Sequence, residues 1–371
     1  MELKEYRFDE VTINFDKKRV PLSGAQREKR QGNFRYYGAQ GVIDHIDDFI
    51  FDGTYLLIAE DGENLKSKKQ NIAQVVEGQF WVNNHAHIVQ GNELCNTRYL
   101  CYLLNSMDLS GYVTGSAQPK LSQANLNAVT LFLPSITVQE RIVECLYLFD
   151  KKIAVNQKIN DNLQQQAAAL FANFYDQAET EVGFTEIIQI LGGGTPKTSE
   201  SSYWNGNVPF FTPKDVGLPY TLTTEKTITE EGLAHCNSGL YPINTVFVTA
   251  RGTVGKVGLS GVPMAMNQSC YALVGKDTHQ LLVYFYTLKA VDRLKHKASG
   301  AVFDAITTRD FESEIIMKLS DDDAKAFLDV AEPIYQAVLS NSIENLRLAA
   351  LRDSLLPKLM SGGIDVSGIQ L

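Results

Sequence analysis

Residues 134–181 read PSITVQERIVECLYLFDKKIAVNQKINDNLQQQAAALFANFYDQAETE, and no further proline or glycine occurs until Gly183. Apolar residues recur in this stretch at alternating spacings of three and four, which is a heptad pattern. This pattern predicts a long amphipathic helix that needs a partner. Two amides interrupt its apolar seam, and buried amides at such positions fix the register of pairing. Thr137 and Glu140 form a capping box that predicts the helix start. The seam consists of Ile142, Leu146, Phe149, Ile153, Asn156, Asn160, Leu163, Ala167, Leu170 and Phe174.

The same pattern returns 185 residues later, which indicates a tandem repeat. The second seam runs through Phe327, Ala331, Ile334, Val338, Asn341, Asn345, Leu348, Arg352, Leu355 and Leu359. We expect Asn156/Asn341 and Asn160/Asn345 layers to specify the register. Pro333 predicts a kink or a late start, with the best helix from about Ile334 to Leu356. The residues expected to pair the helices are Ile153, Asn156, Asn160, Leu163, Leu170, Val338, Asn341, Asn345, Leu348 and Leu355.

The globular segments before the two helices also repeat. The strand-like run Thr54–Ala59 matches Thr245–Ala250, and one helix is expected near Thr97 to Asn105. The sequence therefore predicts an α+β fold with two similar globular domains and two long helices. The expected boundaries are 1–134 and 183–320 for the domains, 135–182 for the first helix, and 321–371 for the second helix and tail.

Length and composition limit the class of protein. A chain of 371 residues is long enough for two or three domains. No apolar run is long enough to span a membrane, and the N-terminus has no signal-peptide pattern. The five cysteines are odd in number and contain no Cys-x-x-Cys pair, which is typical of reduced cytosolic residues. We therefore expect a cytoplasmic protein without membrane association.

Basic residues cluster locally although the net charge is −9, which by itself argues mildly against phosphate binding. The glycine-punctuated stretch from Lys17 to Arg35 is either a solvated surface loop or a loop that follows DNA phosphates. Arg251 either reads guanine in a major groove or is an ordinary turn arginine. The candidate DNA-binding residues are Lys17, Lys18, Arg19, Arg27, Lys29, Arg30, Arg35, Tyr36, Tyr37, Lys66, Lys68, Lys69, Thr195, Lys197, Lys214, Arg251, Thr253 and Lys256.

Catalytic motifs are missing from the sequence. There is no Pro-Pro of an amino-methyltransferase, no phosphate-binding Gly-x-x-x-x-Gly-Lys-Ser/Thr loop, and no Pro-Asp of a common nuclease. His85 and His87 are either a metal pair or ordinary strand residues, and the lack of a third ligand nearby favours the second interpretation. The sequence predicts neither catalysis nor a resident metal or cofactor.

Four stretches, in this order and within a two-fold repeat, resemble the specificity subunit of type I restriction-modification systems. The resemblance implies two target-recognition domains, each reading one half of a bipartite site in double-stranded DNA. It also implies that the two helices pair antiparallel and set the length of the unread spacer. The four stretches are LFLPSITVQERI at 131–142, GGTP at 193–196 with YWNG at 203–206, TARGTVGK at 249–256 and LLPKLMSG at 355–362.

The resemblance further implies a non-catalytic chain that works with partners. These are two methyltransferase subunits, which use S-adenosylmethionine to methylate adenine, and restriction subunits that use ATP and Mg in the full complex. The alternative, from another class, is a coiled-coil adaptor whose globular domains bind proteins without sequence-specific DNA binding.

Overall fold

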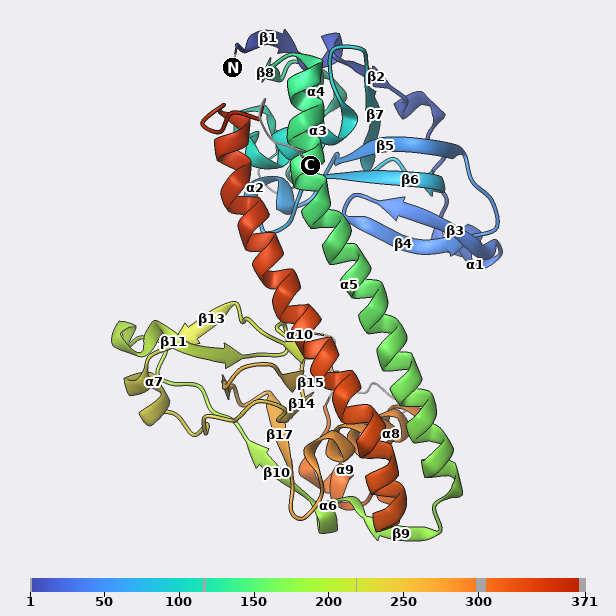
Figure 1. Cartoon of the computed structure of the whole chain (residues 1–371), viewed down its shortest axis with the longest axis vertical. Helices are drawn as coiled ribbons and strands as arrows, with labels where there is room; N and C mark the ends of the chain where they lie inside the picture. Colours follow the sequence, from blue (N-terminus) through green and yellow to red (C-terminus); the bar gives the residue numbers. More distant parts are fainter. Residues whose placement is uncertain (1, 116–117, 218, 298–304, 367–371) are drawn as a thin grey trace. The chain divides into compact units, whose positions relative to one another are not determined.

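The computed structural model describes residues 2–115, 118–217, 219–297 and 305–366. The chain forms two compact units, one from residues 1–151 with 348–371 and the other from residues 152–347. Two long helices, α5 (Ile136–Gln177) and α10 (Asp321–Met360), contribute to both units and are the longest elements in Figure 1. Among the described residues, no helix combines the length and the apolar character needed to cross a bilayer.

The first unit is built on a six-stranded sheet in the order β2-β7-β5-β6-β3-β4. Neighbouring strands are antiparallel except β3 and β6, which are parallel. A separate antiparallel pair, β1 (Lys4–Arg7) and β8 (Thr130–Leu133), leads into α5. The sheet strands are β2 (Thr12–Asn14), β3 (Gln31–Gly38), β4 (Gly41–Ile46), β5 (Phe51–Ala59), β6 (Ala73–Val82) and β7 (Ala86–Gly91).

Strand β5 shows why this sheet is covered on both faces. Leu56 and Ile58 point to a core that also contains residues of α3 (Thr97–Ser106), whereas Leu57 points to a second core on the other face. Helix α3 begins where Asn96 accepts hydrogen bonds from two backbone N–H groups, which confirms the helix expected in this region. The small helices of this unit are α1 (Gly24–Glu28), α2 (Asn64–Ser67), α4 (Gln123–Asn127), η1 (Phe8–Glu10), η2 (Asp16–Lys18) and η3 (Ser110–Tyr112).

The second unit has a five-stranded sheet in the order β10-β17-β14-β15-β12, a three-stranded sheet β13-β11-β16, and the pair β18-β9. The strands are β9 (Thr180–Gly183), β10 (Ile188–Gly192), β11 (Trp204–Phe211), β12 (Tyr220–Thr221), β13 (Lys226–Ile228), β14 (Val246–Thr249), β15 (Val257–Ser260), β16 (Ala265–Met266), β17 (Cys270–Gly275) and β18 (Ile315–Lys318). Its helices are α6 (Phe184–Ile187), η4 (Ser201–Tyr203), α7 (Glu230–Ala234), α8 (Gln280–Lys297) and α9 (Thr308–Glu312).

The two units repeat the same sheet topology. The order β2-β7-β5-β6-β3 corresponds to β10-β17-β14-β15-β12, with three antiparallel contacts followed by one parallel contact in each case. Thr54–Ala59 is the second part of β5 and Thr245–Ala250 includes β14, and these two strands occupy equivalent places. The units differ at the sheet edge, because the first adds β4 and the second forms a separate three-stranded sheet. The tandem repeat predicted from sequence is therefore confirmed.

Helix α10 corrects the expectation of a helix beginning near Ile334. It is continuous from Asp321 to Met360 although Pro333 lies inside it. The Ser320 hydroxyl accepts a hydrogen bond from the Asp323 N–H at 3.2 Å. The acidic residues of the first turn also interact favourably with the positive end of the helix dipole. Pro333 is exposed, so water can satisfy the carbonyl that proline leaves unbonded. The strong N-cap and the burial of Phe327 and Ala331 outweigh the lost hydrogen bond.

Candidate nucleic-acid interface and helix pairing

Two asparagine layers join α5 to α10 within the second unit. The Asn156 side-chain N–H₂ donates to Asn345 Oδ1 at 2.9 Å, and that of Asn341 donates to Asn160 Oδ1 at 2.8 Å. Ascending numbers on α5 meet descending numbers on α10, so the helices run antiparallel here. The layers are therefore Asn156/Asn345 and Asn160/Asn341. The expected pairing of repeat equivalents was wrong, because antiparallel packing exchanges the partners.

The other predicted pairing residues divide between the units. Val338 is buried in the core of the second unit, where Leu163 and Leu170 also pack. Leu355 packs against the core of the first unit, and Leu348 lines an apolar pocket in that unit. Ile153 is half-buried, and its pairing stays a prediction.

A polar contact replaces apolar packing where the helices meet in the first unit. The Arg352 guanidinium donates to Asp150 Oδ1 at 2.5 Å, and the Tyr102 hydroxyl donates to the other oxygen of the same carboxylate. At the repeat-equivalent positions of the second unit stand Ala167 and Tyr335, both buried in its core. The two ends of the helix pair are therefore chemically different.

Replacing Asn160 by leucine should destabilise the helix pair by about 1–3 kcal/mol, because it removes the acceptor of the Asn341 side chain. Exposed Gln157, replaced by alanine, is the matched control and should shift stability by less than about 0.5 kcal/mol. Thermal unfolding of the full chain measures both changes. If the two asparagines form a coupled layer, replacing both by leucine should cost less stability than the two single losses added together. A loss equal to that sum would contradict a coupled layer.

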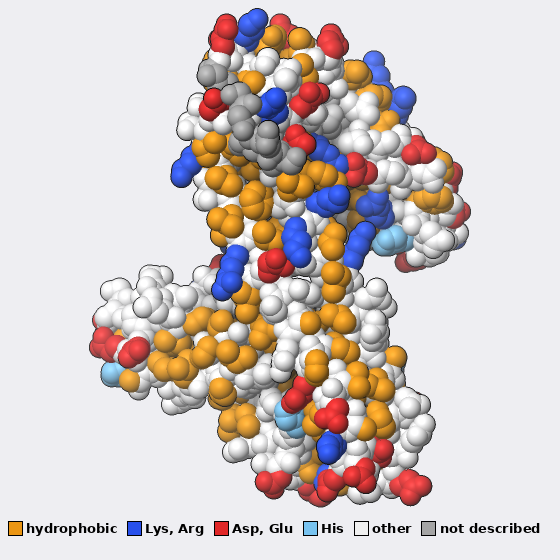
Figure 2. Space-filling model, viewed as in Figure 1, with side chains coloured by type: hydrophobic (Ala, Val, Ile, Leu, Met, Phe, Trp, Pro, Cys, Tyr) orange, Lys and Arg blue, Asp and Glu red, His pale blue; other side chains and the backbone are white. Residues whose placement is uncertain are grey.

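The basic stretch in the first unit is not a loop, which corrects the interpretation of Lys17 to Arg35. It forms η2, α1 and much of β3, and acidic partners from elsewhere neutralise the guanidinium groups of Arg19, Arg27 and Arg30. Arg27 pairs with Asp44 at 2.8 Å, and Arg30 Nε lies 2.8 Å from Asp47. In Figure 2 acidic side chains lie among the basic ones over this unit. These arginines therefore stabilise the fold of the unit.

Tyr36 and Tyr37 are buried, which corrects their assignment to a surface that contacts DNA. Tyr36 lies beneath the Arg27 guanidinium, whose central carbon is 5.2 Å from the ring centroid. Arg35 donates to the Glu77 carbonyl at 2.5 Å. The remaining cations of the stretch, Lys17, Lys18 and Lys29, are exposed.

The second group of lysines in the first unit, Lys66, Lys68 and Lys69, is partly engaged in contacts with a backbone carbonyl and a carboxylate. The Lys66 amine donates to the Gly115 carbonyl at 2.8 Å, and the Lys68 amine lies 3.0 Å from Asp108. Lys69 is exposed at the same surface. Their role in DNA binding stays a prediction.

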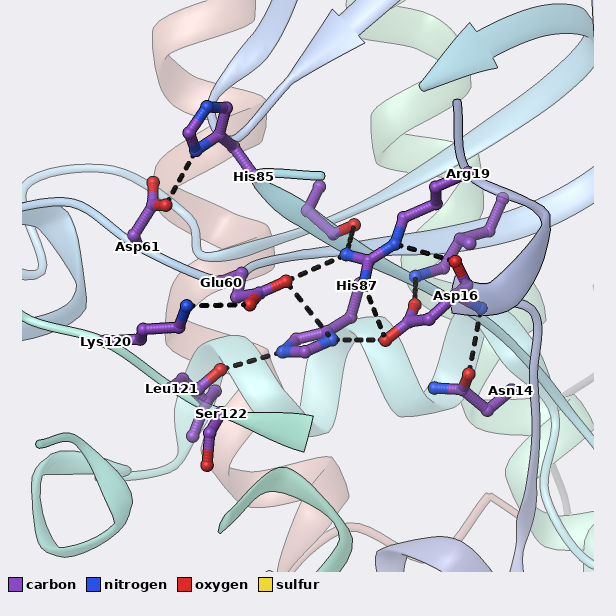
Figure 3. A network of polar contacts seen from close by, with 12 residues as sticks. Asn14, Asp16, Arg19, Glu60, Asp61, His85, His87, Lys120, Leu121 and Ser122 are labelled. Atoms are coloured by element: carbon purple, nitrogen blue, oxygen red, sulfur yellow. Dashed lines mark hydrogen bonds and ion pairs between the residues drawn. The ribbon is translucent and has the colours of Figure 1, made fainter. Parts of the chain in front are cut away.

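Arg19 belongs to a buried network around His87 (Figure 3). It donates to Glu60 and to the Ala86 carbonyl, both at 2.8 Å. His87 Nδ1 lies 2.6 Å from Asp16, and its Nε2 lies 2.8 Å from the Leu121 carbonyl. Since a carbonyl and a carboxylate both accept, this geometry favours a ring protonated on both nitrogens.

The same network fixes the chemistry of Asp16. Burial raises the pKa of its carboxyl, but hydrogen bonds from His87 and the Ile88 N–H, together with the charges of His87 and Arg19, outweigh burial and hold the pKa below its ordinary value. His85 points instead to Asp61, with 2.7 Å between Nδ1 and the carboxylate. In the described part of the chain, no group of three or more His, Cys, Asp or Glu residues could hold a metal ion. The two histidines thus have separate structural partners.

Three predicted residues of the second unit converge on one pocket of about 430 Å³. Lys214 follows β11, and Arg251 and Thr253 follow β14, so two loops far apart in sequence meet at one edge of the sheets. The Thr253 hydroxyl donates to the Pro213 carbonyl at 3.1 Å and links these loops. The complete lining is Thr212, Pro213, Lys214, Glu225, Lys226, Arg251, Gly252, Thr253, Asn267 and Ser269.

The other predicted residues of this unit do not line the pocket. The Thr195 hydroxyl donates to Gln268, next to the pocket in sequence, and Lys197 and Lys256 are exposed elsewhere. Sequence reasoning missed Lys226, whose place depends on the pairing of β11 with β13. Asn267 was also missed, although it precedes β17 just as Asn84 precedes the equivalent strand β7 in the first unit.

Comparison with known proteins identifies the family of this chain. The family model for the type I restriction modification DNA specificity domain matches residues 2–165 and 180–318. A putative type I restriction enzyme specificity subunit of Haemophilus influenzae is 35% identical over 138 residues, which are 37% of this chain and 35% of that protein. The HindI specificity subunit of the same organism is 23% identical over 401 residues, with 84% of each chain covered.

The coverage of these relatives differs. The MjaIX specificity subunit of Methanocaldococcus jannaschii is 31% identical over 124 residues, 32% of this chain and 29% of that protein. The matches to it and to the putative Haemophilus subunit thus span only about a third of either relative.

A solved structure of the S subunit of a type I restriction-modification system from M. genitalium shares the fold. The TM-score is 0.58 at 13% sequence identity, with 97% of this chain and 96% of that chain covered. Both copies of the domain found by the family model lie in units of the same topology. The chain therefore belongs to the family of the type I restriction modification DNA specificity domain and carries that domain twice.

Proposed function

We propose that this chain is a non-catalytic subunit that selects the DNA sequence on which a type I restriction-modification complex acts. Each globular domain reads one half of a bipartite target, and the paired helices determine the gap between the halves. The single observation that carries this proposal is the double match to a DNA specificity domain, each copy adjoining a long helix. The asparagine layers support a helix pair of fixed register, which a fixed gap requires.

Partner subunits have a suitable surface on the first unit. An apolar pocket of about 450 Å³ lies between α5 and the end of α10, and Leu148 and the nearby Leu351 are about half exposed. Figure 2 shows hydrophobic side chains gathered over this part of α10. Exposed apolar patches of this kind mark protein interaction sites. We assign the surface to a methyltransferase subunit that uses S-adenosylmethionine; restriction subunits that use ATP and Mg would join the full complex. The pocket is lined by Cys145, Leu148, Phe149, Leu348, Leu355, Leu359 and Ile364.

Mapping of methylated sites by sequencing, in cells that carry this chain with its methyltransferase subunit, tests the proposed function. We expect modified adenines in a two-part sequence whose parts are separated by a constant number of unspecified base pairs. Cells with the methyltransferase subunit alone are the control and should lack these sites. Methylation of one contiguous sequence, or of none, would contradict the proposal and would favour an adaptor without sequence-specific DNA binding.

A further inference from the structure

The pocket of the second unit has a net positive charge, although most of its lining surface is apolar. Three cations, Lys214, Lys226 and Arg251, line it together with one carboxylate, Glu225. The Asn267 Oδ1 atom accepts the Ser269 N–H at 3.0 Å, so the amide presents its N–H₂ end to other partners. Thr212, Thr253 and Ser269 also line the pocket, but the hydroxyls of the two threonines donate to Asp215 and to the Pro213 carbonyl. This composition favours a ligand that carries negative charge and accepts hydrogen bonds.

The loop that carries Arg251 is held in one conformation. Gly252 and Gly255 have φ values of +83° and +74°, which other residues rarely adopt. The Thr249 hydroxyl accepts the Lys256 N–H at 2.9 Å and closes the loop at its base. The Arg251 N–H donates to the Ser269 carbonyl at 3.2 Å. A fixed loop lowers the entropy cost of placing the guanidinium on a ligand.

The loop that carries Lys214 is fixed by Asp215. This carboxylate accepts the Thr212 N–H at 2.8 Å and the Thr212 hydroxyl at 2.6 Å. Its other oxygen accepts the Glu225 N–H at 2.7 Å, which ties the loop to the start of β13 and so to Lys226. The Lys226 amine lies 5.6 Å from the centroid of the Trp204 ring. The Asp215 carboxylate therefore accepts hydrogen bonds from its own loop and from Glu225. The backbone that carries Lys214 and Lys226 is fixed by these bonds.

We propose that this pocket clamps a phosphate group of the DNA backbone, an inference that rests on the proposed function. A phosphodiester carries one negative charge and only accepts hydrogen bonds, which matches a lining with three cations and several donors. The pocket thus positions the second domain on the duplex, and base reading falls to other residues of that domain. A guanine edge also presents acceptors, so the experiment must separate backbone contact from base contact.

Binding of the full chain with its methyltransferase subunit should be measured by fluorescence anisotropy on two duplexes, one with the mapped target and one without. Salt is varied from about 50 to 200 mM. Lys214→Gln and Arg251→Gln should each lower the slope of log K against log salt by about 1, and should weaken binding to both duplexes by the same factor. Lys325→Gln, an exposed lysine of the same unit, is the control and should leave the slope unchanged. Melting curves check that each variant is folded.

Other outcomes overturn the clamp. If Arg251→Gln removes the preference for the target duplex while the slope stays the same, Arg251 reads a base. Unchanged binding by both pocket variants excludes DNA from the pocket. Displacement of DNA by micromolar inorganic phosphate, lost in the Lys214 variant, would identify a small-anion site instead. Failure of the proposed function looks different, because the unaltered complex would then show no preference between the duplexes, whatever the slopes of the variants.

Discussion

Replacing Asp16 by asparagine should destabilise the first unit by roughly 3–5 kcal/mol, because it breaks the buried pair with the His87 ring at 2.6 Å, whereas Arg19 keeps its ion pair with Glu60. The His87 side chain is 1% exposed and that of Asp16 is 4% exposed, so water cannot replace the lost partner. Asp16 also accepts the Ile88 N–H at 2.8 Å, a bond that connects η2 to β7. Loss of the carboxylate should therefore loosen the segment that carries Lys17 and Lys18.

The two tryptophans of the chain allow each unit to be followed separately. Trp81 lies in the first unit and Trp204 in the second, so a Trp204→Phe background reports urea unfolding of the first unit by fluorescence. Asp9→Asn is the matched control, since its ion pair with Arg7 is exposed and should contribute at most about 1 kcal/mol. Equal unfolding midpoints for the Asp16 and Asp9 variants would show that the buried network does not stabilise the unit.

The same carboxylate predicts how the first unit responds to acid. Because the pKa of Asp16 is lower in the folded state than in the unfolded state, its stabilising effect is complete above its ordinary value of about 4 and is lost as the pH falls through the lowered value. The Asp16→Asn variant should therefore lose part of the acid sensitivity of the parent chain.

Deletion of Ile153–Ile159 from α5 alone should abolish methylation of the two-part target. The deletion removes Asn156 and shortens α5 by roughly 10 Å. Asp150 pairs with Arg352 in the first unit and Asn160 pairs with Asn341 in the second, and both pairs cannot form on continuous helices once only one helix is shortened. We expect a lower melting temperature of the full chain and no bipartite sites on sequencing.

A matched deletion provides the control. Removing Ser342–Leu348 from α10 as well takes out Asn345, the partner of Asn156, and leaves the other two pairs in register. Stability should then return, and the gap of the target should shorten by roughly 3 base pairs at about 3.4 Å per base pair. A single deletion that melts like the parent chain would contradict the paired-helix model, and an unchanged gap in the double deletion would show that the helices do not set the spacer.

Sequence periodicity identified the parts of this fold that depend on local pattern. The heptads predicted both long helices, and the match of Thr54–Ala59 to Thr245–Ala250 predicted equivalent strands. The antiparallel direction was expected, but the partners of Asn156 and Asn160 were wrong, since an offset of 185 residues relates equivalent positions and not contacting ones. Pro333 was misjudged because a strong cap thirteen positions earlier was not weighed against it.

The candidate site was harder to predict, because charge in sequence differs from charge at a surface. Arg27 and Arg30 look available in the sequence, but the pairing of β3 with β4 brings Asp44 and Asp47 against them. Conversely, Lys226 follows a glutamate and looks unremarkable, yet strand pairing places it beside Lys214 and Arg251. Long-range pairing therefore decides which cations remain for a ligand.

The unlike contacts at the two ends of the helix pair affect how the halves can be recombined. A chain made from two copies of the first half would set each Asp150 opposite an alanine, since Ala167 holds the place that Arg352 holds in the second half. Its carboxylate would then lack a cation at both junctions. The two halves of the chain are therefore complementary at this contact, and an exchange of whole halves between relatives should lower stability where this acid and this base do not arrive together.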